Sequence, residues 1–128
     1  MNDLHFAGEV MDKIRERGGQ YDERAYLFVL ASIEYLQGKM PARRHVTGPE
    51  LTHACRDFAI EQYGLMARPV LEHWGIRTTE DFGLIVYLLV DFGLLVTQPN
   101  DKVEDFADVF AFGEAFDQGY VWQGIPGM

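Results

Sequence analysis

Three side chains with the chemistry of a metal site share one face of a predicted helix. Asp57 lies four residues after His53, and Glu50 lies three residues before His53. Residues at these spacings are neighbours on a helix, and imidazole and carboxylate groups can together bind a divalent cation. A helical ion pair explains the spacing equally well, and no His-x-x-x-His or Cys-x-x-Cys pair supports zinc. A small metal-dependent enzyme is therefore an alternative, and we expect no bound metal.

Nucleophilic side chains are scarce. Ser32 is the only serine and lies within an apolar run, and Cys55 is the only cysteine, flanked by Leu51 and Phe58. A reactive thiol needs an electropositive, partly exposed setting, which this context does not provide. Because no Gly-x-Ser-x-Gly motif is present either, we expect both residues in the core and assign no catalytic residue.

A run of oxygen-bearing side chains follows residue 99. Its members are Asn100, Asp101, Glu104, Asp105 and Asp108. Such a group could bind a hard cation, but the spacing and the glycine of an EF-hand are missing. We expect a solvated, exposed turn, with its four acids available to a partner.

Two tripeptides match the magnesium-binding Asp-Phe-Gly of protein kinases, at residues 81–83 and 91–93. They lie ten residues apart on one apolar segment, without a glycine-rich nucleotide loop or a catalytic-loop sequence. We interpret them as the start and the end of a helix, and we expect no nucleotide or other cofactor.

The elements that must position these residues are mostly helical. Apolar residues at helical spacing predict helices near 4–17, 22–38, 47–63, 66–74 and 80–92. Asp22 and Thr47 are suitable N-caps, and Glu50 completes a capping box with Thr47. In the last of these helices, Phe82, Ile85 and Leu89 should face the core.

The segment after Gly93 has a different pattern. Residues 94–97 are β-prone, residues 99–101 form a turn signal, and Val109, Phe110 and Phe112 favour a second strand within 106–116. The prediction is a mainly α domain with a C-terminal β-hairpin, an α+β fold. Within one domain of 128 residues, a winged-helix-like core at 46–117 would follow a helix pair at 1–38 and precede a flexible tail at 118–128.

Several segments together resemble a small family of uncharacterised bacterial proteins, known chiefly from planctomycetes and verrucomicrobia. The matching residues are Tyr26, His45 to Leu51, Trp74 to Gly83 and Gly93 to Leu95, so that the resemblance covers most of the chain. It implies a bacterial origin and a shared domain. It implies no activity, ligand or site residue.

The charge is negative and uneven. The sequence has 11 Lys and Arg against 20 Asp and Glu, a net charge of -9. Residues 1–77 are almost neutral at -1, whereas residues 78–128 carry nine acids and one base, Lys102. This one-sidedness predicts a basic protein partner at Asp101, Glu104, Asp105 and Asp108.

A cytoplasmic location is expected. The first 20 residues contain Asp3, Glu9, Asp12 and Glu16 where a signal peptide would be basic and then apolar, and no apolar run could span a membrane. Tyr120 and Trp122 lie in a tail broken by glycine and proline, which could dock on a neighbour, including a second copy of the chain.

The residues favour a non-enzymatic protein-interaction or adaptor module. The main alternative is a winged-helix regulator that binds nucleic acid through an arginine face. Its residues would be Arg43, Arg44, Arg56, Arg68 and Arg77. Nucleic acid is disfavoured as a partner because the predicted recognition helix at 80–92 has no Lys or Arg, whereas neutralising phosphates requires several.

Overall fold

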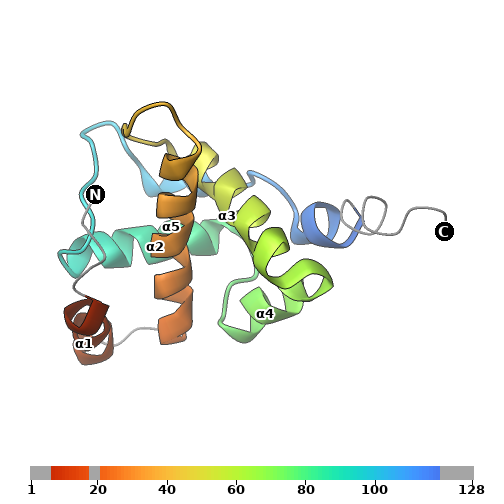
Figure 1. The fold of residues 1–128 in the computed structure, drawn as a ribbon, viewed down its shortest axis with the longest axis horizontal. Coiled ribbons are helices and arrows are strands. Elements are labelled where there is room, and N and C mark those ends of the chain that lie inside the picture. Colours follow the sequence, from red (N-terminus) through yellow and green to blue (C-terminus); the bar gives the residue numbers. More distant parts are fainter. Residues whose placement is uncertain (1–6, 18–20, 119–128) are drawn as a thin grey trace.

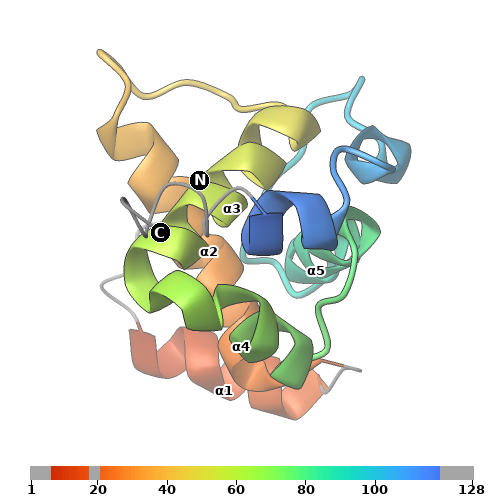
Figure 2. The same ribbon diagram turned by 90° about the vertical axis from the view of Figure 1, so that its right-hand side faces the viewer.

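The computed structural model describes residues 7–17 and 21–118. Its elements are α1 (Ala7–Arg17), α2 (Glu23–Gly38), α3 (Gly48–Tyr63), the 3-10 turn η2 (Gly64–Met66), α4 (Ala67–His73), α5 (Thr79–Asp91), the 3-10 turn η3 (Val103–Phe106) and the π-helical turn η4 (Gly113–Gln118). Figures 1 and 2 show these elements in two views. The described residues are helical or irregular and contain no strand. The mainly α prediction is confirmed.

The predicted hairpin, and with it the wing of a winged helix, is wrong for the described residues. Residues 94–97 form no strand, and the segment 106–116, expected to form the second strand, runs from the last residue of η3 into η4. Asp108 has a φ of 50°, which no strand residue adopts. The rings of Phe112 and Phe116 lie 5.0 Å apart, because residues four apart meet on one helical turn.

The helix ends follow the sequence signals. Asp22 caps α2 by accepting a hydrogen bond from the Arg24 amide at 2.9 Å. Thr47 and Glu50 form the predicted capping box at the start of α3. Glycines in the positive-φ region follow α3 at Gly64 (56°) and α5 at Gly93 (83°). Local chemistry therefore determines where these helices begin and end.

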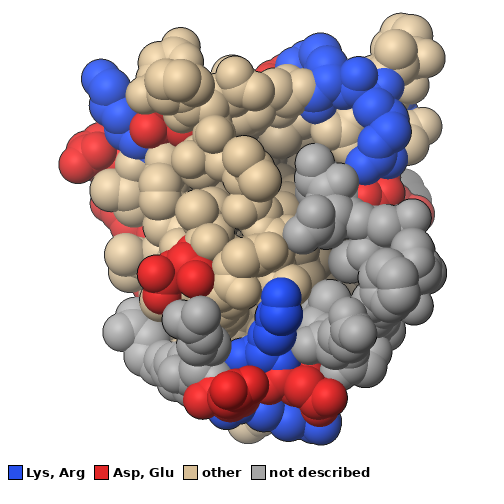
Figure 3. All heavy atoms as spheres, turned by 90° about the vertical axis from the view of Figure 1, so that its left-hand side faces the viewer, with Lys and Arg blue, Asp and Glu red and all other residues tan. Residues whose placement is uncertain are grey.

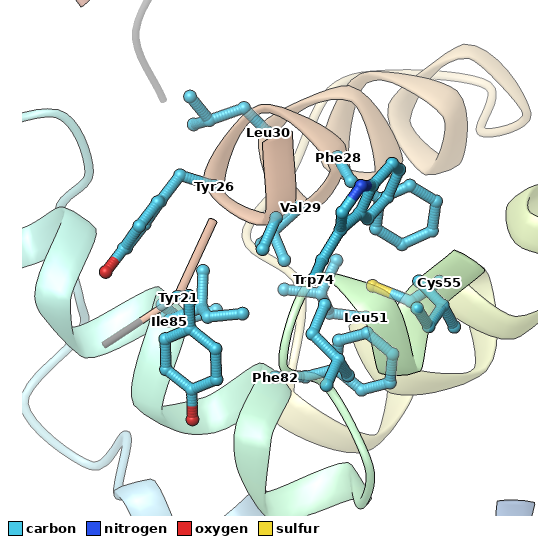
Figure 4. Close-up of a cluster of buried hydrophobic side chains, with 14 of the residues drawn as sticks. Tyr21, Tyr26, Phe28, Val29, Leu30, Leu51, Cys55, Trp74, Phe82 and Ile85 are labelled. Carbon is cyan, nitrogen blue, oxygen red and sulfur yellow. The ribbon is translucent and has the colours of Figure 1, made fainter. Parts of the chain in front are cut away.

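The core is centred on α2, which packs against both α3 and α5 (Figure 1). Tyr26 and Val29 of α2 are buried, as are the three predicted core residues of α5, Phe82, Ile85 and Leu89. Figure 4 shows Val29, Phe82 and Ile85 among the side chains that fill the space between the helices. None of the described helices is long and apolar enough to cross a membrane.

Close packing of η3 against α3 and α5 depends on two glycines. A Cβ atom on Gly83 would lie 2.8 Å from the ring of Phe106, and one on Gly48 would lie 3.1 Å from it. Phe106 is buried by this approach. η3 is thereby held against α5 on one side of a cavity.

Candidate functional site

A cavity of about 390 Å³ lies between two long connections. One connection joins α2 to α3 and lies at the top of Figure 1, and the other joins α5 to η3 and rises along the left side toward that end. The apolar lining comes from Ile33, Val46, Leu51, Val86, Val90, Leu95, Val96 and Phe106. The polar and charged lining comes from Gln37, Arg43, Arg44, His45, Thr47, Tyr87, Thr97, Gln98, Asp101, Lys102 and Asp105.

The two connections are joined by one contact between residues far apart in sequence. The His45 Nε2 and Asp101 Oδ1 atoms are 3.0 Å apart. The other carboxylate oxygen of Asp101 accepts a hydrogen bond from the Gln98 amide at 2.7 Å. Asp101 therefore fixes its own turn and links it to the opposite wall of the cavity.

The α2–α3 connection is itself held by a buried amide. The Gln37 side chain donates to the Arg44 carbonyl at 2.6 Å and accepts from the Arg44 amide at 3.2 Å. Because both hydrogen bonds are to backbone, they set the path of this wall.

The four acids predicted to bind a partner divide into two pairs. Asp101 and Asp105 are partly buried, and the Asp105 carboxylate accepts from the Lys102 amide at the start of η3 at 3.1 Å. Glu104 and Asp108 are exposed, and no hydrogen bond or ion pair joins their side chains to any other described residue. The expectation that all four are exposed is therefore wrong for Asp101 and Asp105, which stabilise the turn.

The arginines of the predicted nucleic-acid patch are on different elements and mostly paired. Arg43 binds Glu34 at 3.0 Å, and Arg44 binds Glu50 at 2.6 Å. The described structure places both on the α2–α3 connection.

The other arginines of that patch lie elsewhere. Arg56 binds Asp57 and donates to the Ala115 carbonyl of η4, and Arg68 binds Glu72. Figure 2 shows η4 beside α3 and α4, the helices that carry Arg56 and Arg68. Arg77 lies between α4 and α5.

The predicted metal face does not form a ligand set. The ring of His53 contacts that of Phe110 in a tilted arrangement with centroids 5.7 Å apart, while Asp57 and Glu50 form ion pairs with arginines. Across residues 7–17 and 21–118, no three His, Cys, Asp or Glu side chains are grouped to hold a metal ion.

The two nucleophiles are in the core, as predicted. Ser32 and Cys55 are fully buried, and Ser32 donates its hydroxyl to the Phe28 carbonyl. Burial raises the pKa of the Cys55 thiol to about 12, so that the nucleophilic thiolate is suppressed.

Tyr87 belongs to this region but was not among the site residues predicted from the sequence. It lines the cavity from α5, and its buried hydroxyl has no hydrogen-bond partner among the described residues. Burial raises the pKa of this phenol, and the charges of Asp101, Asp105 and Glu104 raise it further. A tyrosine on an apolar helix gives no sequence signal for such surroundings.

Comparisons with known proteins give one local similarity. No protein family and no solved structure matches the chain. A segment of Beige protein homolog 1 from Saccharomyces cerevisiae is 33% identical to it over 79 residues, which are 62% of this chain. The chain spans about 4% of the length of that yeast protein.

The aromatic residues of the predicted docking tail, Tyr120 and Trp122, lie outside the described residues.

Proposed function

We propose that this protein is a non-enzymatic interaction module that binds a basic protein partner through the acidic end around η3. The proposal rests on two carboxylates at this end that form no hydrogen bond or ion pair within the described structure. Glu104 and Asp108 are exposed and unpaired within the described structure. Membership of the bacterial family that the sequence resembles is also a proposal.

The contrast with the first half of the chain supports this assignment. Ion pairs between 15 and 72 join Arg15 to Glu23, Arg24 to Asp22, Arg43 to Glu34, Arg44 to Glu50, Arg56 to Asp57 and Arg68 to Glu72. These pairs compensate charge locally, whereas the excess of acids after residue 77 has Lys102 as its one basic residue. Complementary charge accelerates encounter and rejects wrong partners.

The proposal assigns no catalytic role. The thiol of Cys55 is buried, and Glu50, His53 and Asp57 of α3 are engaged in ion pairs or an aromatic contact. Paired arginines likewise leave less positive charge to neutralise phosphates, which disfavours the nucleic-acid alternative.

Affinity purification from the native host with matched charge variants tests the proposal. The double variant Glu104→Lys and Asp108→Lys should lose the partner that wild type retains. The control, Glu16→Lys and Glu61→Lys, changes net charge equally at exposed positions on α1 and α3. Equal recovery of the partner by wild type and by both double variants would refute the proposal.

A further inference from the structure

The cavity beside the acidic surface has the size of a ligand site. Its volume of about 390 Å³ falls within the range of about 300–1,000 Å³ that is typical of small-molecule sites. Val86 and Val90 of α5, Ile33 of α2 and Leu51 of α3 are among its lining residues. These side chains provide an apolar floor for an aliphatic chain.

The charged side chains that line the cavity are not all neutralised by a partner of opposite charge. The guanidinium groups of Arg43 and Arg44 are each paired with a glutamate, at 3.0 and 2.6 Å. Asp101 and Asp105 line the cavity with Lys102, and Glu104 is next to them in the chain. Two lining carboxylates against one lining ammonium leave a negative excess at this end, which Glu104 extends outside the cavity, and this excess favours a cation.

The surroundings of Tyr87 are consistent with this sign. The carboxylates of Asp101, Asp105 and Glu104 all raise the pKa of its phenol. Its hydroxyl is buried without a hydrogen bond in the described structure. Leaving such a group unsatisfied is costly, so a ligand that supplied a hydrogen-bonding group here would gain stability.

We propose that this cavity binds an aliphatic chain that ends in a cation, and that its natural occupant is a lysine or arginine side chain of a protein partner. The inference rests on the proposed function and names what its partner inserts. A protein source is favoured over a free amine because Glu104 and Asp108 continue the negative surface outside the cavity. Figure 3 shows one face whose centre is largely uncharged, with charged side chains around its margin.

Three six-carbon probes of different charge test the ligand class. n-Hexylammonium, 1-hexanol and hexanoate are titrated into the full chain, and backbone amide shifts of Gly48 and Thr97 are followed by NMR. Hexylammonium should bind on the order of tenfold more tightly than hexanoate, with hexanol between them. Equal or tighter binding of hexanoate, or no saturable shift at these amides, would overturn the proposal.

Cavity-filling variants test the location. Thr97→Trp and Val90→Trp should each weaken hexylammonium binding on the order of tenfold. Leu84→Trp is the matched control, because Leu84 lies on the same helix as Val90 and does not line the cavity. Thermal melting shows whether each variant is folded, and the loop variant Thr97→Trp avoids the packing of α5. An equal loss in Leu84→Trp would place the probe elsewhere.

The source of the cation is tested with the peptide acetyl-Lys-Ala-Lys-Ala-Lys-amide. Reversing Glu104 and Asp108 to Lys should weaken peptide binding and leave hexylammonium binding unchanged. If both probes respond equally, the protein source is refuted.

In the capture experiment, loss of the partner in Glu104→Lys/Asp108→Lys but not in Thr97→Trp would refute the cavity inference alone. Retention of the partner by the charge-reversal variant, together with its loss in Thr97→Trp, would refute the proposed function alone.

Discussion

Glu50 is held by two kinds of donor at the start of α3. Its carboxylate accepts from the Arg44 guanidinium at 2.6 Å and from the Thr47 amide at 2.9 Å. The hydrogen bond from Arg44 is the main cause that lowers the pKa of Glu50 from 4.5 to about 2, followed by that from Thr47. The ionised carboxylate is thus preferred more strongly in the folded chain than in the unfolded chain.

A pH-dependent contribution to stability follows. The stabilisation is fully present above the unfolded pKa and is lost as pH falls from about 4.5 to about 2. The Glu50 side chain is 36% exposed, so that solvent screening makes the effect modest. The gap in unfolding free energy between wild type and Glu50→Gln should shrink as denaturant titrations are moved from about pH 6 to about pH 2.5. A gap of the same size at both pH values would contradict this.

Cys55 should be chemically silent in the folded protein. Its thiol is fully buried and its pKa is raised to about 12, so both access and ionisation oppose alkylation. Iodoacetamide labelling followed by mass spectrometry should be slow in buffer and fast in denaturant. Labelling of the folded chain at the denatured rate would show that the thiol is accessible.

Residue chemistry could be predicted from the sequence where it is local. The capping roles of Asp22, Thr47 and Glu50 depend on residues within three positions, and the structure confirms them. The roles of Asp101 and Tyr87 depend on residues brought close by folding. Sequence spacing alone therefore predicted that Asp101 is an exposed acid and did not place Tyr87 in a site.

At the scale of elements, the contact between η3 and α5 depends on Gly83. Alanine there would improve helix propensity by up to about 1 kcal/mol, yet its Cβ would lie 2.8 Å from the Phe106 ring. Overpacking typically costs about 1–3 kcal/mol. Gly83→Ala should therefore lower the unfolding free energy in denaturant titrations.

A matched glycine and a compensating change make this test specific. Gly38→Ala on α2 should leave stability unchanged or raise it, because nothing lies within 4 Å of the added Cβ. Gly83→Ala should cost less in a Phe106→Ala background, because Phe106→Ala removes the Cγ and Cδ1 atoms that lie 2.8 Å from the added Cβ. Equal effects of Gly83→Ala and Gly38→Ala would exclude the steric explanation.

The helices were predictable because periodicity and capping signals coincide within 22–92, where α2 to α5 begin and end close to the expected residues. The structure of the region after residue 93 could not be predicted in the same way. Phe106 is buried against two glycines distant in sequence, and Phe112 and Phe116 meet edge to face across a helical turn. Aromatic residues favour strands on average, but tertiary packing decided the local structure here.

At the scale of the whole molecule, the net charge of -9 does not show how the charges are distributed between paired and exposed positions. Arginines and carboxylates are paired among residues 15–72, while Glu104 and Asp108 stand exposed and unpaired within the described structure. The cavity opens beside this acidic end. The sequence predicted the asymmetry, and only the fold placed it next to a cavity.

The most direct test of the central claim is the association rate with the captured partner at increasing ionic strength. For wild type the association rate should fall as salt rises while the dissociation rate changes little, because long-range attraction between exposed charges is screened. Glu104→Lys/Asp108→Lys should associate slowly at low salt and lose this dependence, and Glu16→Lys/Glu61→Lys should retain it. Identical association rates for wild type and the Glu104→Lys/Asp108→Lys variant at all salt concentrations would contradict an interaction through the acidic end.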